Sequence, residues 1–172
     1  MTKVYKVLLT SDLKAIKTVE YSLIEKEVRW HSTFLDIAKR MGDNSHCVSH
    51  KVGAVLVKNN RIISTGINGT PSGHTNCDEV FDANNFDRQE HHEWSNLNEL
   101  HAEINALMIA AREGIATKDS IIYVTVSPCT SCCKAIVAAG IRKVIFSELY
   151  DADIEGLKIL LLNDTEVYLI DM

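Results

Sequence analysis

The sequence predicts an α/β fold, a three-layer α/β/α sandwich built around a mixed sheet of five strands. Two observations predict this class. Residues 51–67 contain two β-branched runs joined by a two-residue polar turn, which is the pattern of an antiparallel hairpin. After residue 100, strand patterns alternate with helical patterns, and this alternation requires right-handed crossovers and parallel pairing. The length of 172 residues suits one domain, residues 1–172, with its own hydrophobic core.

The beginning of the chain is predicted to be helical. From Asp12 to about Arg40, apolar residues recur mostly at three- and four-residue steps, as they do on the buried face of an amphipathic helix. We interpret residues 1–31 as an N-terminal helical extension for packing or oligomerisation, because this part of the chain contains no cluster of reactive side chains.

The middle of the chain contains the hairpin and a long connection. The two strands are expected at residues 51–58 and 61–67, with Asn59 and Asn60 as the turn. Residues 69–98 then show no sustained period, over a length far beyond the usual connection of about 4–6 residues. A connection of this length usually has a function or is fixed by contacts to the rest of the protein.

The second half of the chain is predicted to alternate between helix and strand. A helical period runs from Leu100 to Ala111 and stops near Gly114, and a dense apolar strand follows at Ile121–Val126. The remaining predicted elements are a helix at 132–139 closed by Gly140, a strand at 143–146, a helix at 154–162 and a strand at 166–170.

Composition and charge argue against several classes of protein. Charged residues make up 24% and hydrophobic residues 46%, which is not the composition of a disordered or fibrous chain. The formal net charge of -5 argues against a nucleic-acid polymer as partner, because such polymers select basic surfaces. No apolar stretch approaches the roughly 20 residues of a membrane span, so we expect a cytoplasmic protein without a membrane partner.

Three of the five cysteines are crowded between residues 129 and 133, which suits metal binding better than a disulfide framework. Cys129 and Cys132 stand at a predicted helix start, where both thiolates point the same way and the helix dipole favours their ionised form. His101, at the start of another helix, is expected to be the third ligand. A zinc ion with three protein ligands keeps a fourth position for water, which is the catalytic arrangement. We interpret Cys133 as a packing residue.

Glu103, two residues after His101, is the predicted catalytic proton carrier. Zinc lowers the pKa of a bound water from about 15.7 to about 7, and Glu103 would take protons from this water and pass them to the substrate and to its leaving group. Two residues on a regular helix are about 200° apart, so His101 and Glu103 face one metal only if they lie in an irregular first turn. The alternative is a non-catalytic zinc module, which has no need of a free carboxylate at the metal.

The paired motifs His101-Ala-Glu103 and Pro128-Cys-Thr-Ser-Cys132 are the known signature of zinc nucleobase deaminases. With the stretches 51–54, 66–73 and 76–77, the chain resembles the bacteriophage type of the deoxycytidylate (dCMP) deaminase family, within the cytidine deaminase-like superfamily, from about residue 34 to 169. The resemblance implies hydrolysis of dCMP to dUMP and ammonia in pyrimidine deoxynucleotide biosynthesis. It also implies a homohexamer, in the host cytoplasm if the chain is of phage origin, activated by dCTP, inhibited by dTTP, with Mg²⁺ beside the effector nucleotide.

Individual residues receive roles from the same resemblance. Asn68 is expected to contact the sugar of the substrate, and Tyr150 to lie near the nucleotide. Ala102 and Ser127 are further expected substrate contacts, and Arg112 is an expected subunit contact. The cations that bind the 5′-phosphate stay open among Lys51, Arg61, Arg112, Arg142 and Lys143.

A second, structural zinc is also implied by the resemblance, with ligands that map onto Cys47, Cys77, His91 and Glu99. The residues support it independently, because two cysteines and a histidine lie at the edges of the long irregular segment, which a metal would order. The alternatives are that the cysteines are buried thiols, or that His92 or His74 replaces His91.

Other deaminases of the superfamily are rival interpretations. A deaminase of a base in tRNA or single-stranded DNA needs a positive surface, and the net charge speaks against it. A member acting on cytidine, CMP, guanine or a riboflavin precursor is opposed only by the loop from Asn68 to Gly73, which distinguishes the dCMP deaminases.

Overall fold

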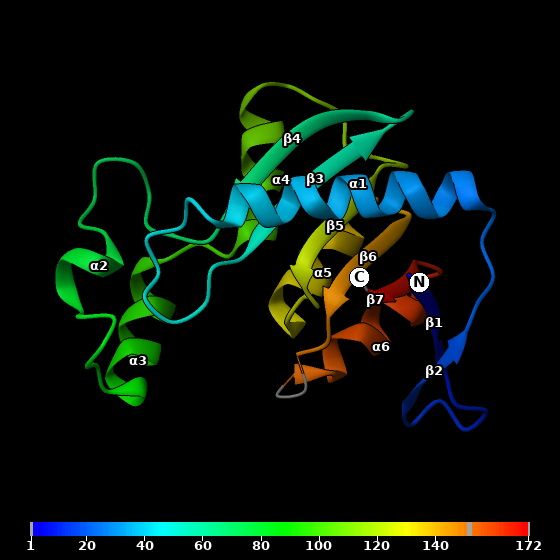
Figure 1. Cartoon of the computed structure of the whole chain (residues 1–172), viewed down its shortest axis with the longest axis horizontal. Coiled ribbons are helices and arrows are strands. Elements are labelled where there is room, and N and C mark those ends of the chain that lie inside the picture. Colours follow the sequence, from blue (N-terminus) through cyan, green and yellow to red (C-terminus); the bar gives the residue numbers. More distant parts are fainter. Residues whose placement is uncertain (1, 151–152, 172) are drawn as a thin grey trace.

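Across residues 2–150 and 153–171, which the computed structural model describes, seven strands form one sheet in the order β2-β1-β7-β6-β5-β3-β4 (Figure 1). The strands are β1 (Lys3–Leu9), β2 (Ile16–Glu20), β3 (Gly53–Lys58), β4 (Arg61–Ile67), β5 (Ile121–Val126), β6 (Lys143–Glu148) and β7 (Glu166–Asp171). The helices are α1 (Glu25–Gly42), α2 (Cys77–Val80), α3 (Arg88–Asn98), α4 (Ala102–Arg112), α5 (Thr130–Ala138) and α6 (Glu155–Leu162).

The pairing of the central strands confirms the predicted mixed sheet. Strand β5 pairs in parallel with β6, and β6 pairs in parallel with β7. Strand β3 is antiparallel to both β4 and β5. The two residues between β3 and β4, Asn59 and Asn60, have φ angles of 52° and 58°, the left-handed conformation that tight hairpin turns need and that asparagine tolerates.

The N-terminal prediction is wrong over its first part, and the strand count of five is wrong with it. Residues 3–20 form an antiparallel hairpin, β1 and β2, and β1 pairs with β7 to extend the sheet. Only Glu25–Gly42 of the expected helix is helical. Strand β2 has no buried face, so its sequence lacks the alternation that marks a strand, and only its pairing with β1 makes it one.

Helices pack on both faces of the sheet. Along β5, Ile122 and Val124 belong to one hydrophobic cluster, with buried residues of α4, α5 and α6, whereas Tyr123 belongs to another cluster with residues of α1. Successive side chains of a strand point to opposite faces, so α1 covers one face and α4, α5 and α6 cover the other. In Figure 1, α1 crosses in front of β3, β5 and β6. No helix within the described residues has the length and hydropathy of a membrane span.

One glycine decides how closely α4 approaches the sheet. A Cβ atom at Gly66 in β4 would lie 2.2 Å from the carbonyl oxygen of Ala102 and 2.5 Å from the amide nitrogen of Ala106. Any other residue would therefore push the beginning of α4 outward. This contact sets the position of His101 and Glu103 relative to the sheet.

The long segment 69–98 is less irregular than the sequence suggested. It contains α2 and α3, which lie beyond the end of the sheet in Figure 1. Helix α3 begins where the Asp87 carboxylate accepts a hydrogen bond of 2.8 Å from the amide of Glu90. Asn76, before α2, donates its backbone N–H to the Glu79 carboxylate at 2.6 Å. In the sequence, these capping pairs are the local features that indicate the start of each helix.

Candidate active site

His101, Cys129 and Cys132 come together at the starts of α4 and α5. The Nδ1 atom of His101 lies 3.4 Å from the sulfur of Cys129 and 3.4 Å from that of Cys132. Ligands of a tetrahedral zinc, with bonds of about 2.0–2.3 Å, stand roughly 3.5 Å apart. The three atoms therefore fit one zinc ion, as the sequence predicted for this cluster, which we call the His101 cluster.

The local backbone explains how His101 and Glu103 share one site. His101 is the N-cap of α4 with φ −71° and ψ 152°, an extended conformation, so it lies just outside the helix. Glu103, in the first turn, is 4% exposed. The predicted irregular start of this helix is confirmed. Burial raises the pKa of Glu103, which brings this carboxyl group nearer to the range in which it can both accept and return a proton.

The thiols form a polarised pair. Hydrogen bonding from Cys132, with a further contribution from His101, lowers the pKa of Cys129 to about 4, so Cys129 is a thiolate at neutral pH. The same bond and burial raise the pKa of Cys132. Cys133 points elsewhere, with its sulfur 3.4 Å from the carbonyl oxygen of Pro128, and burial raises its pKa. Cys133 is thus a buried packing residue outside the cluster, as predicted.

A second group of ligand atoms, the His91 cluster, joins Cys47, Cys77 and His91. The Nε2 atom of His91 lies 3.6 Å from the Cys47 sulfur and 3.3 Å from the Cys77 sulfur, and all three residues are buried. Of the alternatives from the sequence, His92 is exposed and contacts Asn96, and His74 is exposed.

Glu99 follows α3, in the segment that connects the two clusters along the chain. Ser95 donates a hydrogen bond to its Oε2 atom. Its Oε1 atom is the one buried side-chain nitrogen or oxygen without a hydrogen-bond partner in residues 2–150 and 153–171. A carboxylate oxygen in this condition is a fitting metal ligand, because burying it unpaired costs about 1–3 kcal/mol or more.

Residues 28–148 match the protein-family model described as the cytidine and deoxycytidylate deaminase zinc-binding region. This chain belongs to that family. The deoxycytidylate deaminase of Enterobacteria phage T2 is 40% identical, with 73% of this chain and 83% of the relative covered. That of Enterobacteria phage T4 is 40% identical, with 73% and 81% covered. The solved dCMP deaminase of cyanophage S-TIM5, in complex with dCMP and dUMP, is 33% identical over 86% of this chain and 98% of that chain, with a TM-score of 0.67.

Asn68 was expected to contact the sugar of the substrate, and in the structure its side chain forms hydrogen bonds to backbone groups of neighbouring residues. The Asn68 Oδ1 atom accepts from the Val52 amide at 2.8 Å, and its Nδ2 donates to the His50 carbonyl at 2.8 Å. Asn68 therefore shapes the connection between α1 and β3. Each side-chain group retains one free hydrogen-bonding position, so contact with a sugar stays a prediction.

The other expected substrate residues lie next to the zinc ligands along the chain. Ala102 is fully buried between His101 and Glu103. Ser127 is buried two residues before Cys129, and its Oγ accepts a hydrogen bond of 2.8 Å from the backbone of Tyr150. Tyr150 is 42% exposed. The structure thus joins Ser127 and Tyr150, from the ends of β5 and β6, at the edge of the sheet that holds the His101 cluster.

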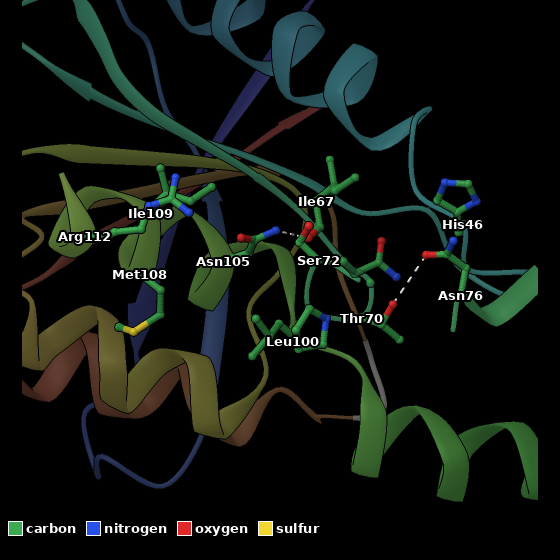
Figure 2. A pocket seen from close by; sticks show the side chains of 13 residues that line it. His46, Ile67, Thr70, Ser72, Asn76, Leu100, Asn105, Met108, Ile109 and Arg112 are labelled. Carbon is green, nitrogen blue, oxygen red and sulfur yellow. Dashed lines mark hydrogen bonds between the residues drawn. The ribbon is translucent and has the colours of Figure 1, made fainter. Parts of the chain in front are cut away.

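A hollow of about 450 Å³ lies beside α4, and Figure 2 shows its lining. Asn105, Met108 and Arg112 line it from the helix, and Thr70 and Ser72 from the connection after β4. The Asn105 Nδ2 atom donates to the Ile67 carbonyl at 2.9 Å. The ligands of the His101 cluster are not among the lining residues, so this hollow is distinct from the metal site.

The candidate cations for a phosphate are scattered. Lys143 pairs with Glu166 at 3.5 Å, and Arg112 pairs with Glu113 at 2.9 Å. Arg142 donates from its Nε to the Asp119 carbonyl at 3.0 Å. The structure does not gather these cations at the His101 cluster.

Sequence reasoning missed one residue at this site. Asp153, before α6, accepts hydrogen bonds from the backbone and the hydroxyl of Thr130, the residue that follows Cys129. The two residues are 23 positions apart, and no local pattern connects them.

Proposed function

We propose that this chain catalyses the zinc-dependent hydrolysis of dCMP to dUMP and ammonia in pyrimidine deoxynucleotide biosynthesis. The observation that carries the proposal is a three-ligand cluster of zinc dimensions beside a buried carboxylate that is not a ligand, Glu103. The 33% identical dCMP deaminase of cyanophage S-TIM5, solved with dCMP and dUMP, supports the choice of substrate.

Glu103 performs the proton transfers. Bound zinc supplies an activated water at neutral pH. Glu103 would accept one proton from that water and deliver it to N3 of the cytosine, and it would then take the second proton from the hydroxyl group now on C4 and deliver it to the amine that leaves. Water and dCMP thus become dUMP and ammonia. Because burial raises the pKa of Glu103, the protonated form is less unfavourable than in a solvated glutamate, which suits a group that alternates between the two forms.

The remaining site residues position the substrate. His101, Cys129 and Cys132 would supply three ligands to a zinc ion and leave its fourth coordination position free. Ala102 and Ser127 lie on the two chain segments that supply the ligands, and we propose that they contact the cytosine. Asn68 and Tyr150 are the proposed contacts to the sugar and to the rest of the nucleotide.

An ultraviolet assay of amine loss across dCMP, CMP, deoxycytidine and dCTP tests the proposal. We expect dCMP to have the highest kcat/KM, by at least about tenfold, since each lost hydrogen bond or charge contact costs about 1.4 kcal/mol or more. Equal rates on deoxycytidine would contradict a phosphate requirement. Salt-sensitive binding of RNA on a filter would favour a polymer substrate instead.

We propose that the His91 cluster binds a second, structural zinc, with Glu99 as the fourth ligand. Support comes from the buried triad of Cys47, Cys77 and His91 at zinc-compatible distances, and from the unpartnered Oε1 atom of Glu99. A structural zinc contributes about 10–16 kcal/mol of apparent binding free energy. That is enough to hold α2 and α3, which bury one residue each, Cys77 and His91.

We further propose a homohexamer in the host cytoplasm, activated by dCTP and inhibited by dTTP with Mg²⁺, in which Arg112 contacts a neighbouring subunit. The side chain of Arg112 is 73% exposed and lines the hollow beside α4, where it is available to a partner. Sedimentation velocity with and without dCTP and Mg²⁺ tests this. A monomer whose rate of dCMP deamination does not change with dCTP or dTTP would contradict this proposal.

We propose that residues 1–172 form a single domain with α/β/α layers. Two hydrophobic clusters that share the strands of one sheet support this arrangement. One cooperative unfolding transition, the same by fluorescence and by circular dichroism, is the expected observation.

A further inference from the structure

The start of α5 is held by a carboxylate from another part of the chain. Thr130 is the first residue of α5, and the N-cap, Cys129, makes no side-chain capping bond. The Thr130 amide donates to Oδ2 of Asp153 at 2.7 Å, and the Thr130 hydroxyl donates to Oδ1 of Asp153 at 2.6 Å. Both oxygens of one carboxylate are therefore used on a single residue.

This bond is placed between the two zinc-binding cysteines. Cys129 precedes Thr130, and Cys132 lies two residues after it. Amide groups in the first turn of a helix have no partner inside the helix, and a negative charge there is stabilised by the helix dipole. A carboxylate that satisfies such an amide fixes the backbone of the turn, and with it the direction of both sulfur atoms.

Residues at the end of β6 and in α6 hold the region of the two cysteines from two sides. On the strand side, the Ser127 amide donates to the Glu148 carbonyl at 2.8 Å, and Ser127 Oγ accepts from the Tyr150 amide at 2.8 Å. On the helix side, α6 packs against α5 so closely that a Cβ atom at Gly156 would lie 2.8 Å from the Cα of Thr130. Only a glycine permits this approach.

The Asp153 carboxylate is ionised at neutral pH. Hydrogen bonds from the hydroxyl and then the amide of Thr130 lower the pKa of Asp153, and a backbone bond from Gly156 adds to this effect. Asp153 thus joins the start of α6 to the start of α5 as a charged acceptor.

We propose that Asp153 is a positioning residue for the catalytic zinc, which acts through Thr130 to keep Cys129 and Cys132 in ligand geometry. The inference rests on the proposed function, because it takes His101, Cys129 and Cys132 as the zinc ligands. Its role is separate from that of Glu103, since Asp153 holds the helix that presents the ligands and transfers no proton.

Zinc release to a chromogenic chelator, and the absorption spectrum of the cobalt-substituted full-length protein, test the proposal in a Cys77→Ala parent, which lacks the second thiolate pair. Asp153→Ala is expected to weaken zinc binding by about 10–100-fold, as for other groups that orient metal ligands. Its thiolate-to-cobalt charge-transfer band should shift or weaken. Asp153→Asn retains one acceptor oxygen and should lose less. We expect kcat of both variants to fall and KM to stay within about twofold of the parent value, because the variants alter the zinc site and not the nucleotide contacts.

Thr130 and Glu155 provide the matched variants. Thr130→Val removes the hydroxyl donor and should accelerate zinc release several-fold, whereas Thr130→Ser retains the bond and should restore the rate of the parent. Glu155→Ala removes a neighbouring acid, which is bonded to Lys158 at 2.8 Å, and should release zinc at the rate of the parent.

Zinc release and a cobalt spectrum equal to those of the parent in Asp153→Ala and Thr130→Val would overturn the inference, even if the melting temperature fell. If Asp153→Ala does not fold, Thr130→Val and Thr130→Ser decide the question. A Cys77→Ala parent without a thiolate-to-cobalt band would overturn the proposed function itself, and this outcome differs from a band that the further variants leave unchanged.

Discussion

The two metal-ligand clusters contain the same residue types in different surroundings. Each has two cysteine sulfurs around one histidine nitrogen, at 3.4 and 3.4 Å in the His101 cluster and at 3.6 and 3.3 Å in the His91 cluster. His101 is exposed, at helix ends that pack on the sheet, whereas Cys47, Cys77 and His91 are all buried. The ring of His91 packs against both Phe81 and Phe86, with distances between ring centroids of 5.3 and 5.2 Å.

The difference teaches that the surroundings of a ligand set, more than its composition, decide its role. The His101 cluster stands on elements that the hydrophobic core already holds, so a zinc ion there would be free to serve chemistry. The His91 cluster joins segments with little buried apolar surface, so the proposed second zinc would contribute stability there. Glu103 belongs to a helix of the core, whereas Glu99 belongs to the peripheral segment and lies outside the group of ligand atoms from Cys47, Cys77 and His91.

The largest expected effect is on turnover, and it distinguishes the carboxylates of Glu103 and Glu99. Glu103→Gln should retain zinc and lose turnover by about 10²–10⁴-fold or more, because an amide cannot transfer the proton. His101→Ala should lose the catalytic metal altogether. Glu99→Gln is the matched change at the other cluster and should keep turnover within about tenfold. Metal analysis and the ultraviolet assay measure both properties. Normal turnover in Glu103→Gln would end the proton-transfer role.

The second effect concerns metal content. Purified protein should contain two zinc ions per chain, and Cys77→Ala should contain one, with the catalytic zinc retained. We expect the fluorescence of Trp94, whose ring lies 5.6 Å from that of Phe81, to change, and residues 74–99 to become sensitive to proteases. A Trp30→Phe background isolates this signal.

Cys133→Ala is the control for Cys77→Ala, because Cys133 is a buried thiol outside both clusters. This variant should keep two zinc ions. A wild-type content of one zinc ion per chain would contradict the structural site.

The third effect tests how the core supports the His101 cluster. Gly66→Ala should destabilise the protein by about 1–3 kcal/mol or more, because the added Cβ meets the backbone of α4. Zinc release from the catalytic site should accelerate, while the His91 cluster keeps its metal. Ile62→Ala, at an exposed position of the same strand, is the control. Equal acceleration at both clusters would show that they are one coupled unit.

The last effect is absent at neutral pH: it is a pH dependence of stability due to His31, which must be separated from that of the metal ligands before the two clusters are compared in acid. His31 is buried, with its Nδ1 2.8 Å from the Tyr123 hydroxyl. Burial, and then the charge of Lys143, lower the pKa of His31 from 6.5 to about 4, while Glu27 opposes the shift. The unfolded chain therefore binds a proton between these pH values that the folded chain does not. Stability is fully present above pH 6.5 and falls as the pH drops toward 4.

His31→Leu should make this fall shallower, by up to about 3 kcal/mol in the free energy of unfolding at pH 4. Urea unfolding of both proteins across this range measures the difference, in which proton uptake by the metal ligands cancels. Tyr123→Phe keeps the buried histidine and should keep the steep fall. Parallel curves for His31→Leu and the wild type would contradict the assignment.

Much of the central fold followed from local patterns. The strand at Ile121–Val126 was predicted at its observed bounds, because a short, dense apolar run fits a strand buried on both faces. Strand β2 and helix α3 were not predicted, because β2 has no buried residue and the one buried residue of α3, His91, is polar, so neither produces an apolar period in the sequence. The polar capping pair of Asp87 and Glu90 was the one local signal for α3.

The sequence by itself predicted the grouping of His101, Cys129 and Cys132, with Glu103 beside it, since each motif lies at an element boundary and has a local spacing. Tertiary structure alone decided the hairpin at the sheet edge, the choice of His91 over its neighbours, and the bond from Asp153 to Thr130. These features depend on contacts between residues far apart in the chain. Such contacts leave no period or spacing, because each partner is compatible with many local conformations until the core brings them together.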